Sequence, residues 1–356
     1  MIELRDHWTD QRAWDEFVDS HQQGRFSHLL AYGDVVQCYG YRPHNIAFIK
    51  NRVLIGVLPA VEARSLLFGR RMISQPFSEY GGILASSELS DDDVRSMFRE
   101  LDSFLLRNRR YGTMEVHGNH GVPARLREFN FQAKHAHHIA YLRTAKPTNE
   151  IWQNVIQYEA RKAVNKARRS AIEIVDECDA KIIRKLFYPM YLRSAKRLGV
   201  PPHKVDYYLD CYRAFGARMK MLWALRGSTR IGALLGFASG QRVSIINTVS
   251  DPEYWGLRPN DLLHWDFIRR TAESGYAFFD FGSVRYGGQE HFKKKWGCEF
   301  EDYKCYFWSG SEVSASARTF NTSGATMSFF SRLWATCVPI TVSAYCGPVI
   351  RKHLMR

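Results

Sequence analysis

Residues 45–60 have the sequence NIAFIKNRVLIGVLPA, in which two apolar runs are separated by the polar residues 50–52. Apolar runs of this length on either side of a short polar break are typical of a β-hairpin. Residues 222–237, LWALRGSTRIGALLGF, have the same pattern, and the Ile-Gly pair at 55–56 recurs at 231–232, an offset of 176 positions. The two stretches therefore predict two related hairpins.

The elements that follow each hairpin also repeat. Ser90 and three aspartates after it are typical of a helix start, and a short strand is expected at 113–116. In the second half, residues 259–261, Pro-Asn-Asp, start a helix that ends before a strand over 276–281. Helical segments are also expected before the hairpins, at 10–38 and 179–216. The sequence therefore predicts an α/β (α+β) fold made of two tandem units of related topology.

The composition is that of a globular protein with more than one domain. The chain has 356 residues, of which 45% are hydrophobic and 24% charged. One core would be unusually large at this length, so two compact units are expected. The predicted organisation is a first domain over 1–146, a second over 147–308, a linker rich in Ser, Ala, Thr and Gly over 309–326, and a tail over 327–356.

Charge and cysteine content indicate which partners and which cellular compartment to expect. Fifty Lys and Arg against 36 Asp and Glu give a net charge of +14, which favours phosphates, nucleic acid or anionic lipid as partners. The seven cysteines are scattered and never form a C-x-x-C pair, so neither a disulfide framework nor a zinc ribbon is expected. Residues 1–17 contain acids and no apolar stretch, so no secretory signal is expected. A cytoplasmic protein is predicted.

A basic stretch over 151–174 predicts a long amphipathic helix with Trp152 and several alanines on one face. Basic side chains on the other face are spaced to form a patch of the size of a phosphate, and a solvated basic face is the alternative. The patch residues predicted to bind substrate are Arg161, Lys162, Lys166 and Arg168.

Two other stretches contain groups suited to acid–base or anion chemistry. The turn-rich loop 74–82 places Glu79 beside Tyr80, and a carboxylate in a glycine-lined loop can accept a proton or hold an amine. Capping of a turn is the plainer interpretation of such a glutamate. Residues 291–297 contain three consecutive lysines, which in a strand or turn cannot all face one ligand. One or two of them are expected to reach a buried group.

No metal site is predicted. Histidines concentrate at 117–138, but no acidic or cysteine partner stands at ligand spacing. The chain also has no G-x-S-x-G elbow, H-E-x-x-H, Walker loop or G-x-G-x-x-G after a strand, which disfavours hydrolase, zincin, NTPase and dinucleotide-binding functions.

The tail contains an uncharged stretch over 333–350, between Arg332 and a basic end at 351–356. Length alone would allow a membrane span, but two prolines and a glycine interrupt the stretch and polar residues dilute it. A segment that packs on the body or lies on a bilayer surface is therefore expected. The basic end favours peripheral contact with the anionic inner face of the plasma membrane.

With these features in place, residues 5–308 resemble the Fem-type transferases and the related FemAB-like and BioF2-like acyltransferases of the GNAT superfamily. The similarity is closest to the FemAB-like proteins that accompany bacterial exopolysaccharide and exosortase systems. It rests on five blocks in a fixed order, residues 56–59, 74–82, 161–167, 257–260, and 279–282 with 292–297.

The resemblance implies two tandem acetyltransferase-type (GNAT) folds with a site between them. It also implies transfer of an aminoacyl or acyl group onto an amine of a cell-envelope or polysaccharide precursor, a phosphorylated or lipid-linked glycan. The donor would be aminoacyl-tRNA or an acyl thioester, with no permanently bound cofactor. Lys293 would lie beside the reacting carbonyl, and Glu79, where many relatives have Asp, would face the acceptor. The other matching residues expected to bind substrate are Tyr80, Asn260, Asp280, Lys295 and Trp296.

The chemistry of acyl transfer suits these residue types. Attack of an amine on an ester or thioester builds an oxyanion that an ammonium such as Lys293 can stabilise, and a carboxylate can take the proton of the amine. Acetyl-CoA-dependent GNAT domains hold pyrophosphate on backbone N–H groups at the start of a central helix. Here Pro259 has no N–H and Asp261 repels phosphate, so CoA binding in the usual mode is disfavoured.

Three other functions stay open at this stage. One is an acyl-CoA-dependent GNAT N-acyltransferase. Another is a non-catalytic module that binds nucleic acid or anionic lipid through its basic faces, with affinity that falls steeply with salt. The third is a scaffold that recruits a polysaccharide assembly complex through its tail.

Overall fold

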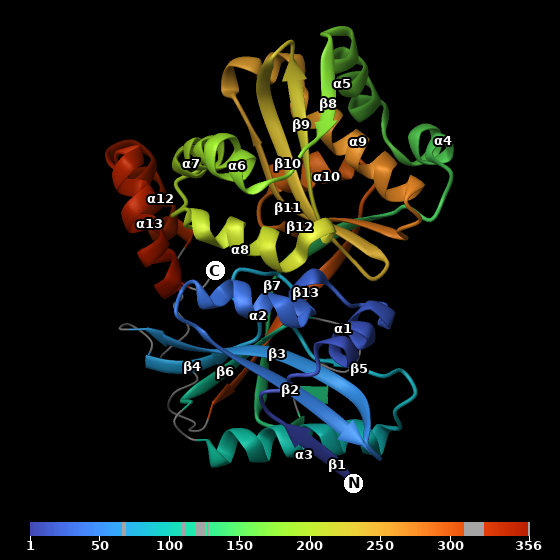
Figure 1. The fold of residues 1–356 in the computed structure, drawn as a ribbon, viewed down its shortest axis with the longest axis vertical. Coiled ribbons are helices and arrows are strands. Elements are labelled where there is room, and N and C mark those ends of the chain that lie inside the picture. The colour runs from blue at the N-terminus through green and yellow to red at the C-terminus, as the bar shows by residue number, and fades with distance from the viewer. Residues whose placement is uncertain (66–68, 109–110, 119–124, 127, 310–323, 355–356) are drawn as a thin grey trace. The chain divides into compact units, whose positions relative to one another are not determined.

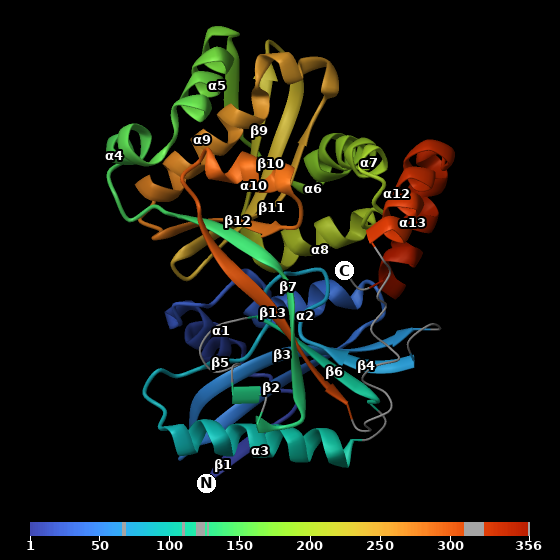
Figure 2. The same ribbon diagram turned by 180° about the vertical axis from the view of Figure 1, so that it is seen from behind.

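The protein is described by a computed structural model that covers residues 1–65, 69–108, 111–118, 125–126, 128–309 and 324–354 (Figures 1 and 2). The chain divides into two compact units, each with a sheet and a hydrophobic core. Unit 1 comprises Met1–Ala136, Asp302–Phe329 and Val349–Arg356, and unit 2 comprises His137–Glu301 and Phe330–Pro348.

The sheet of unit 1 has the strand order β1-β2-β3-β4-β6-β13. The strands β2 (Arg42–Lys50) and β3 (Val53–Ser65) form the predicted hairpin, and β4 (Gly69–Ile73) pairs antiparallel with β3. The helix α3 (Asp91–Arg107) then leads to β6 (Thr113–His117), which lies parallel to β4. Figure 2 shows α3 on one face of this sheet and α1 and α2 on the other. The remaining elements are β1 (Ile2–Arg5), α1 (Gln11–Ser20), α2 (Leu30–Gln37) and β5 (Leu84–Ala85).

The sheet of unit 2 has the strand order β7-β12-β11-β10-β9-β8. A hairpin of β9 (Met219–Arg226) and β10 (Thr229–Ser239) is followed by the antiparallel strand β11 (Arg242–Ser250), the helix α9 (Pro259–Glu273) and β12 (Phe278–Val284), which is parallel to β11. The remaining elements include α4 (Thr148–Glu150), α5 (Tyr158–Arg169), β8 (Ile172–Asp176), α6 (Ala180–Ile182), α7 (Tyr188–Arg197), α8 (Val205–Phe215) and α10 (Gly287–Lys294). Both units therefore contain a hairpin, a third strand, a helix and a parallel strand, and the predicted tandem repeat is confirmed.

Each sheet is completed by a strand from the other half of the sequence. The strand β7 (Phe131–Arg143) follows β6 in the chain, but its residues 138–143 pair with β12 of unit 2. The strand β13 (Glu299–Ser309) follows α10, but its residues 305–309 pair with β6 of unit 1. This exchange is why the units divide the chain differently from the predicted domains 1–146 and 147–308.

The repeated Ile-Gly pair has a packing reason. A Cβ atom on Gly56 would lie 2.8 Å from Cε of Met97 on α3, and one on Gly232 would lie 3.4 Å from Cδ1 of Leu263 on α9. The glycine of the first hairpin therefore lets α3 approach the sheet closely. At Gly232 the tighter contacts are with the neighbouring strand, Ser250 Cβ and the carbonyl oxygen of Val249, both at 3.2 Å.

The prediction of one long helix over 151–174 is wrong, because this segment contains two separate helical stretches. A π-helical turn, Ile151–Val155, ends at Ile156, whose ψ of 127° is extended, and α5 starts two residues later. Arg161 explains the break, since its Nη1 donates to the carbonyl oxygens of Trp152, Gln153 and Ile156. The guanidinium satisfies carbonyls that a continuous helix would have used internally.

The tail forms two helices, α12 (Gly324–Cys337) and α13 (Ile340–Leu354). Lys196 Nζ donates to the carbonyl oxygen of Val338 at 2.9 Å within unit 2, and the Tyr41 hydroxyl donates to that of Lys352 at 2.6 Å within unit 1. Residues 310–323 of the predicted linker lie outside the described residues. In the described parts of the chain, no helix is both long and apolar enough to cross a membrane.

Candidate functional site

The loop over residues 74–82 of unit 1 has strained backbone that is anchored to its neighbours. Gln75 and Phe77 have φ angles of 48° and 66°, in the left-handed region that residues other than glycine seldom adopt. Ser74 Oγ accepts a hydrogen bond from the backbone N–H of His117 at 2.7 Å. Strain that the surrounding structure holds in place is concentrated at functional sites in proteins, which makes this loop a candidate.

Glu79 and Tyr80 lie near the end of this loop, where their backbone is fixed. The Tyr303 hydroxyl donates to the carbonyl oxygen of Glu79, and Ser27 Oγ donates to that of Tyr80 at 2.8 Å. The Tyr80 side chain is buried, with the guanidinium carbon of Arg25 5.0 Å from its ring centre. Glu79 is half-buried, so of this predicted pair it is the residue with a partly open side chain.

Lys293 of α10 is a buried ammonium in unit 2, with only 7% of the residue exposed. Its Nζ donates to three backbone carbonyl oxygens at the end of β12, those of Phe281 at 2.7 Å, Gly282 at 3.0 Å and Ser283 at 2.7 Å. An ammonium has three N–H donors. A direct hydrogen bond from Lys293 to a reacting oxygen therefore requires one of these carbonyl contacts to be replaced.

Asp280 supports the same carbonyls from within β12. It is buried, and its Oδ1 accepts a hydrogen bond from the backbone N–H of Gly282 at 2.8 Å. Gly282 has a φ of 69°, and the pairing of β12 with β7 shifts register between these two residues. Asp280 therefore stabilises a β-bulge whose carbonyl oxygens meet the Lys293 ammonium.

The start of α9 contains a buried charge pair. Lys295 Nζ donates to Oδ1 of Asp261, and the side chains are 16% and 6% exposed. The carbonyl oxygen of Asn260 accepts from His264 Nδ1 at 2.6 Å, whereas its Oδ1 is buried without a hydrogen-bond partner among the described residues. Burial lowers the pKa of His264 to about 4, so its ring is neutral at pH 7. Lys295 therefore compensates the Asp261 charge that was expected to repel phosphate.

Trp296 is fully buried in the core of unit 2. Its ring centre lies 5.9 Å from that of His264, with the planes 29° apart. This predicted substrate contact is therefore a core residue of unit 2 with no exposed surface.

Of the three consecutive lysines, Lys293 and Lys294 lie at the end of α10 and Lys295 lies in the turn that follows. Lys294 points away from the core and forms an ion pair with Glu290 at 2.6 Å, with both side chains exposed. Lys293 and Lys295 are the two that reach buried groups, as predicted for one or two of the three.

The predicted basic patch on α5 is only partly assembled. Lys162, Lys166 and Arg168 are exposed, but Arg161 is half-buried and binds the carbonyls of the preceding turn. The guanidinium carbon of Arg168 lies 5.3 Å from the ring centre of Trp152. Arg168 lines an open hollow together with Thr148, Asn149, Trp152 and Trp265.

Cys298, which packs against the core of unit 2, is unsuited to nucleophilic catalysis. Burial raises the pKa of the Cys298 thiol, despite the lowering effect of the nearby Lys293 charge. A thiol must ionise to act as a nucleophile. This agrees with direct attack of an amine on the donor, which needs no covalent enzyme intermediate.

Several of these contacts had no signal in the sequence. Asp261 and Lys295 are 34 residues apart, and Glu79 and Tyr303 are 224 apart. Such pairs meet only through the sheet topology. The His264 contact could have been found, because His264 lies four residues after Asn260 on a predicted helix.

Residues 156–294 match the family model described as an acetyltransferase (GNAT) domain. Most of unit 2 is therefore similar to a GNAT acetyltransferase domain. The expected fold of two tandem GNAT units is confirmed, and the chain is an acyltransferase. No curated protein sequence matches the chain.

Solved structures are similar in fold over most of the chain. One is entitled crystal structure of FemX, with a TM-score of 0.71, 12% identity, and coverage of 85% of this chain and 96% of that one. Another is the C-terminal domain of a putative lysylphosphatidylglycerol synthetase from Agrobacterium fabrum, with a TM-score of 0.57, 12% identity and coverage of 86% and 93%. A tandem GNAT protein from the clavulanic acid biosynthesis pathway has a TM-score of 0.54, 10% identity and coverage of 87% and 99%.

Proposed function

We propose that this acyltransferase moves an aminoacyl or acyl group onto an amine of a cell-envelope or polysaccharide precursor. The observation that carries the proposal is the GNAT match over residues 156–294, a segment that contains Lys293 in its buried polar setting. The fold likeness to FemX and to a putative lysylphosphatidylglycerol synthetase supports a glycan- or lipid-linked acceptor and aminoacyl-tRNA as donor. Association with exopolysaccharide systems is part of the proposal.

In this proposal the Lys293 ammonium stabilises the oxyanion that forms when the amine attacks the donor carbonyl. Its three carbonyl contacts hold it in place before the reaction, and the substrate oxygen replaces one of them. The bond that forms is the new amide C–N bond, and the bond that breaks joins the carbonyl to the ribose oxygen or the thioester sulfur. The attacking amine loses its proton to a carboxylate or to water.

We assign the remaining predicted residues to binding the substrates or to shaping the site. Asn260 has a buried side-chain oxygen without a partner among the described residues, which suits a donor N–H of the substrate. Lys162, Lys166 and Arg168 offer exposed cations for the phosphates of the donor or acceptor. Asp280, Lys295 and Trp296 are largely buried, and we assign them to shaping the surroundings of Lys293. Tyr80 is buried in unit 1, and we assign it to shaping the loop 74–82.

We further propose that the tail rests on an anionic membrane, where a lipid-linked acceptor would be found. Large apolar side chains on α12 and α13 are exposed, among them Phe330 at 58%, Tyr345 at 83% and Val349 at 57%. Arg351 and Lys352 follow on the last turn of α13. Apolar side chains combined with basic residues favour an anionic bilayer surface.

The donor class is tested by supplying the full chain with radiolabelled aminoacyl-tRNA or acyl-CoA and a panel of amine-bearing glycan and lipid precursors. We expect label in an amide product from at least one donor. Lys293→Ala should remove it, whereas the matched variant Lys294→Ala, changed at an exposed lysine of the same helix, should retain it. Equal transfer by wild type and Lys293→Ala would contradict the assigned role of Lys293.

A donor of the acyl-CoA type is the second candidate, because the matching family is one of acetyltransferases. Pro259 at the first position of α9 removes one backbone donor from the usual pyrophosphate site, which favours aminoacyl-tRNA. Label from acyl-CoA alone would reverse this order of preference.

A further inference from the structure

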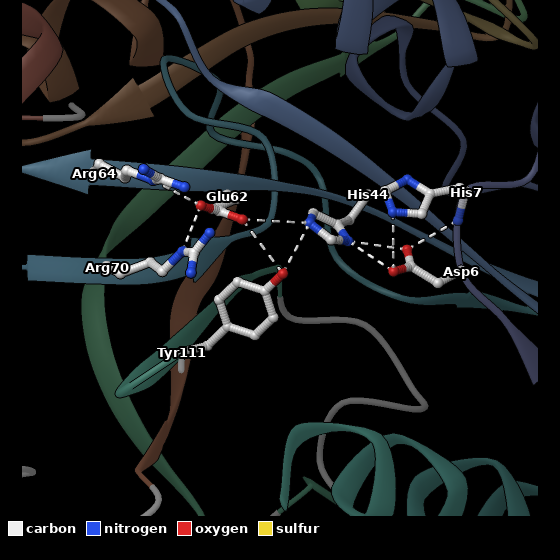
Figure 3. Close-up of polar contacts among 7 residues, drawn as sticks. All are labelled: Asp6, His7, His44, Glu62, Arg64, Arg70 and Tyr111. Carbon is white, nitrogen blue, oxygen red and sulfur yellow. Dashed lines mark hydrogen bonds and ion pairs between the residues drawn. The ribbon is translucent and has the colours of Figure 1, made fainter. Parts of the chain in front are cut away.

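A polar cluster in unit 1 joins the end of β1 to β2. Asp6 and His7 follow β1, and His44 lies in β2 (Figure 3). The His44 side chain is fully buried, and those of Asp6 and His7 are 20% and 46% exposed. Residues far apart in the sequence are therefore assembled at the rim of the sheet.

The donor atoms of these three residues converge. His44 Nδ1 lies 2.8 Å from Oδ2 of Asp6, and His7 Nε2 lies 3.3 Å from the same oxygen. The rings of His7 and His44 have centres 4.6 Å apart, and one ligand atom from each residue lies within 4.8 Å of the others. His7 reaches this position because its backbone is left-handed, with a φ of 58°. A strained residue that aims its ring at a buried histidine needs a reason beyond a surface ion pair.

These spacings fit a tetrahedral metal ion. Zinc binds imidazole nitrogen and carboxylate oxygen at about 2.0–2.2 Å, which places neighbouring ligand atoms about 3.3 Å apart. The Asp6–His7 distance of 3.3 Å has this value. The 2.8 Å contact between Asp6 and His44 is a hydrogen bond in this structure, and it would lengthen by about 0.5 Å when an ion replaces its proton. Two imidazoles with one carboxylate are also a common ligand set of zinc.

The far side of His44 has the support that metal-bound histidines usually have. Its Nε2 lies 3.2 Å from the hydroxyl of Tyr111 and 4.0 Å from Oε2 of Glu62. Glu62 is buried and fixed by Arg70 Nε at 2.5 Å and Arg64 Nε at 3.0 Å (Figure 3). An imidazole that binds metal through Nδ1 carries its proton on Nε2, where these oxygens can accept it.

We propose that Asp6, His7 and His44 bind one divalent transition-metal ion, with zinc the best match, and that Glu62 and Tyr111 orient His44. The partly exposed His7 leaves the outer side open for entry of the ion and for water as the fourth ligand. A simple Asp6–His44 ion pair is the competing explanation, and it would not need His7.

The test is titration of the chelator-treated full chain with Co²⁺, followed by its ligand-field absorption and by displacement with Zn²⁺. We expect one ion per chain with the spectrum of a tetrahedral site. His7→Gln should weaken binding by more than the 10–100-fold that changes in outer-shell partners cause, and Tyr111→Phe by about 10-fold. The matched control His291→Gln, at an exposed histidine, should bind as the wild type does.

Two results would overturn the proposal. The first is absence of a tetrahedral Co²⁺ spectrum in the wild type, or a His7→Gln variant that binds as tightly. The second is loss of binding in Cys305→Ser with retention in His7→Gln. That outcome would move the ion to Glu115, His117 and Cys305, whose ligand atoms also lie within 4.8 Å of one another.

Discussion

The helices α3 of unit 1 and α9 of unit 2 occupy the same place in the repeat and start differently. Ser90 caps α3 in a capping box, and its first turn contains three aspartates. The start of α9 has a left-handed Arg258 without a side-chain cap, then Pro259 and a single acid. Both helices have an aspartate at the third position, Asp93 and Asp261.

The partners of these two aspartates explain the difference. Asp93 pairs with Lys50, whose side chain is 36% exposed. Asp261 instead pairs with Lys295, whose side chain is only 16% exposed. Carboxylates in the first turn of a helix repel other anions, so phosphate binding at the start of α3 is disfavoured. In unit 2 the single acid is paired with Lys295, and Pro259 removes one backbone donor from the helix start. The two units therefore share the fold but differ in the charge and the capping of this helix start.

The largest expected effect comes from breaking the buried pair. Lys295→Met leaves the Asp261 carboxylate buried without its cation and should lower the free energy of unfolding by about 3–5 kcal/mol. Urea denaturation at pH 7 measures it. The double variant Lys295→Met with Asp261→Asn should recover most of the loss, and Lys50→Met in unit 1 should change stability far less. Equal effects of Lys295→Met and Lys50→Met would remove the contrast between the units.

A second comparison concerns the glycines of the two candidate loops. A Cβ on Gly82 would lie 2.3 Å from the carbonyl oxygen of His117, whereas one on Gly282 would meet nothing within 4 Å. Gly82→Ala should therefore cost about 3 kcal/mol through overpacking. Gly282→Ala should cost about 1 kcal/mol, because only its left-handed φ is strained. Thermal unfolding of the two variants ranks them, and the reverse order would contradict the packing described for the unit 1 loop.

Acid sensitivity should be shared by the units, since each contains a buried neutral histidine. Burial lowers the pKa of His28 in unit 1 to about 3 and of His264 in unit 2 to about 4. Below pH 6.5 the unfolded chain binds protons that the folded chain does not, so stability is present above that pH and is lost as the pH falls.

At pH 5 each histidine should contribute a loss of about 2 kcal/mol relative to pH 7.5. In His264→Gln the loss measured by urea denaturation at the two pH values should be smaller by that amount. The exposed His291→Gln should show the full loss. An unchanged pH dependence in His264→Gln would mean that the ring is not held neutral.

The smallest expected effects lie at the helix starts. Ser90→Ala removes the cap of α3 and should cost about 1 kcal/mol. Arg258→Gly should instead stabilise the protein by up to about 1 kcal/mol, because glycine adopts the left-handed φ of 65° without strain. Opposite signs in thermal melts would sharpen the contrast between α3 and α9.

The sequence predicted the repeated elements well because each has a local signal. The Ile-Gly pairs, Ser90 with its aspartates, and Pro259 mark hairpins and helix starts from neighbouring residues alone. The two compact units divide the chain differently from the predicted domains, because β7 pairs with β12 and β13 pairs with β6, and local patterns do not reveal pairing between distant strands. The break after Ile151–Val155 was missed because Arg161 satisfies carbonyls of the preceding turn.

The candidate site was predicted less completely than the fold. The family resemblance picked out Lys293 and Glu79, but the three carbonyl partners of Lys293 follow from a β-bulge that residue types do not reveal. Periodicity placed Lys162 and Lys166 on the exposed face correctly, and it could not foresee that Arg161 turns inward.

The most direct test of the account is the rate of amide formation by the purified full chain with a labelled aminoacyl or acyl donor and an amine acceptor. Transfer is expected from the wild type and from Lys294→Ala. In Lys293→Ala the rate should fall by about 10²-fold or more, with the variant still folded by circular dichroism. Undiminished transfer by folded Lys293→Ala would contradict the claim that the reaction takes place beside this buried ammonium.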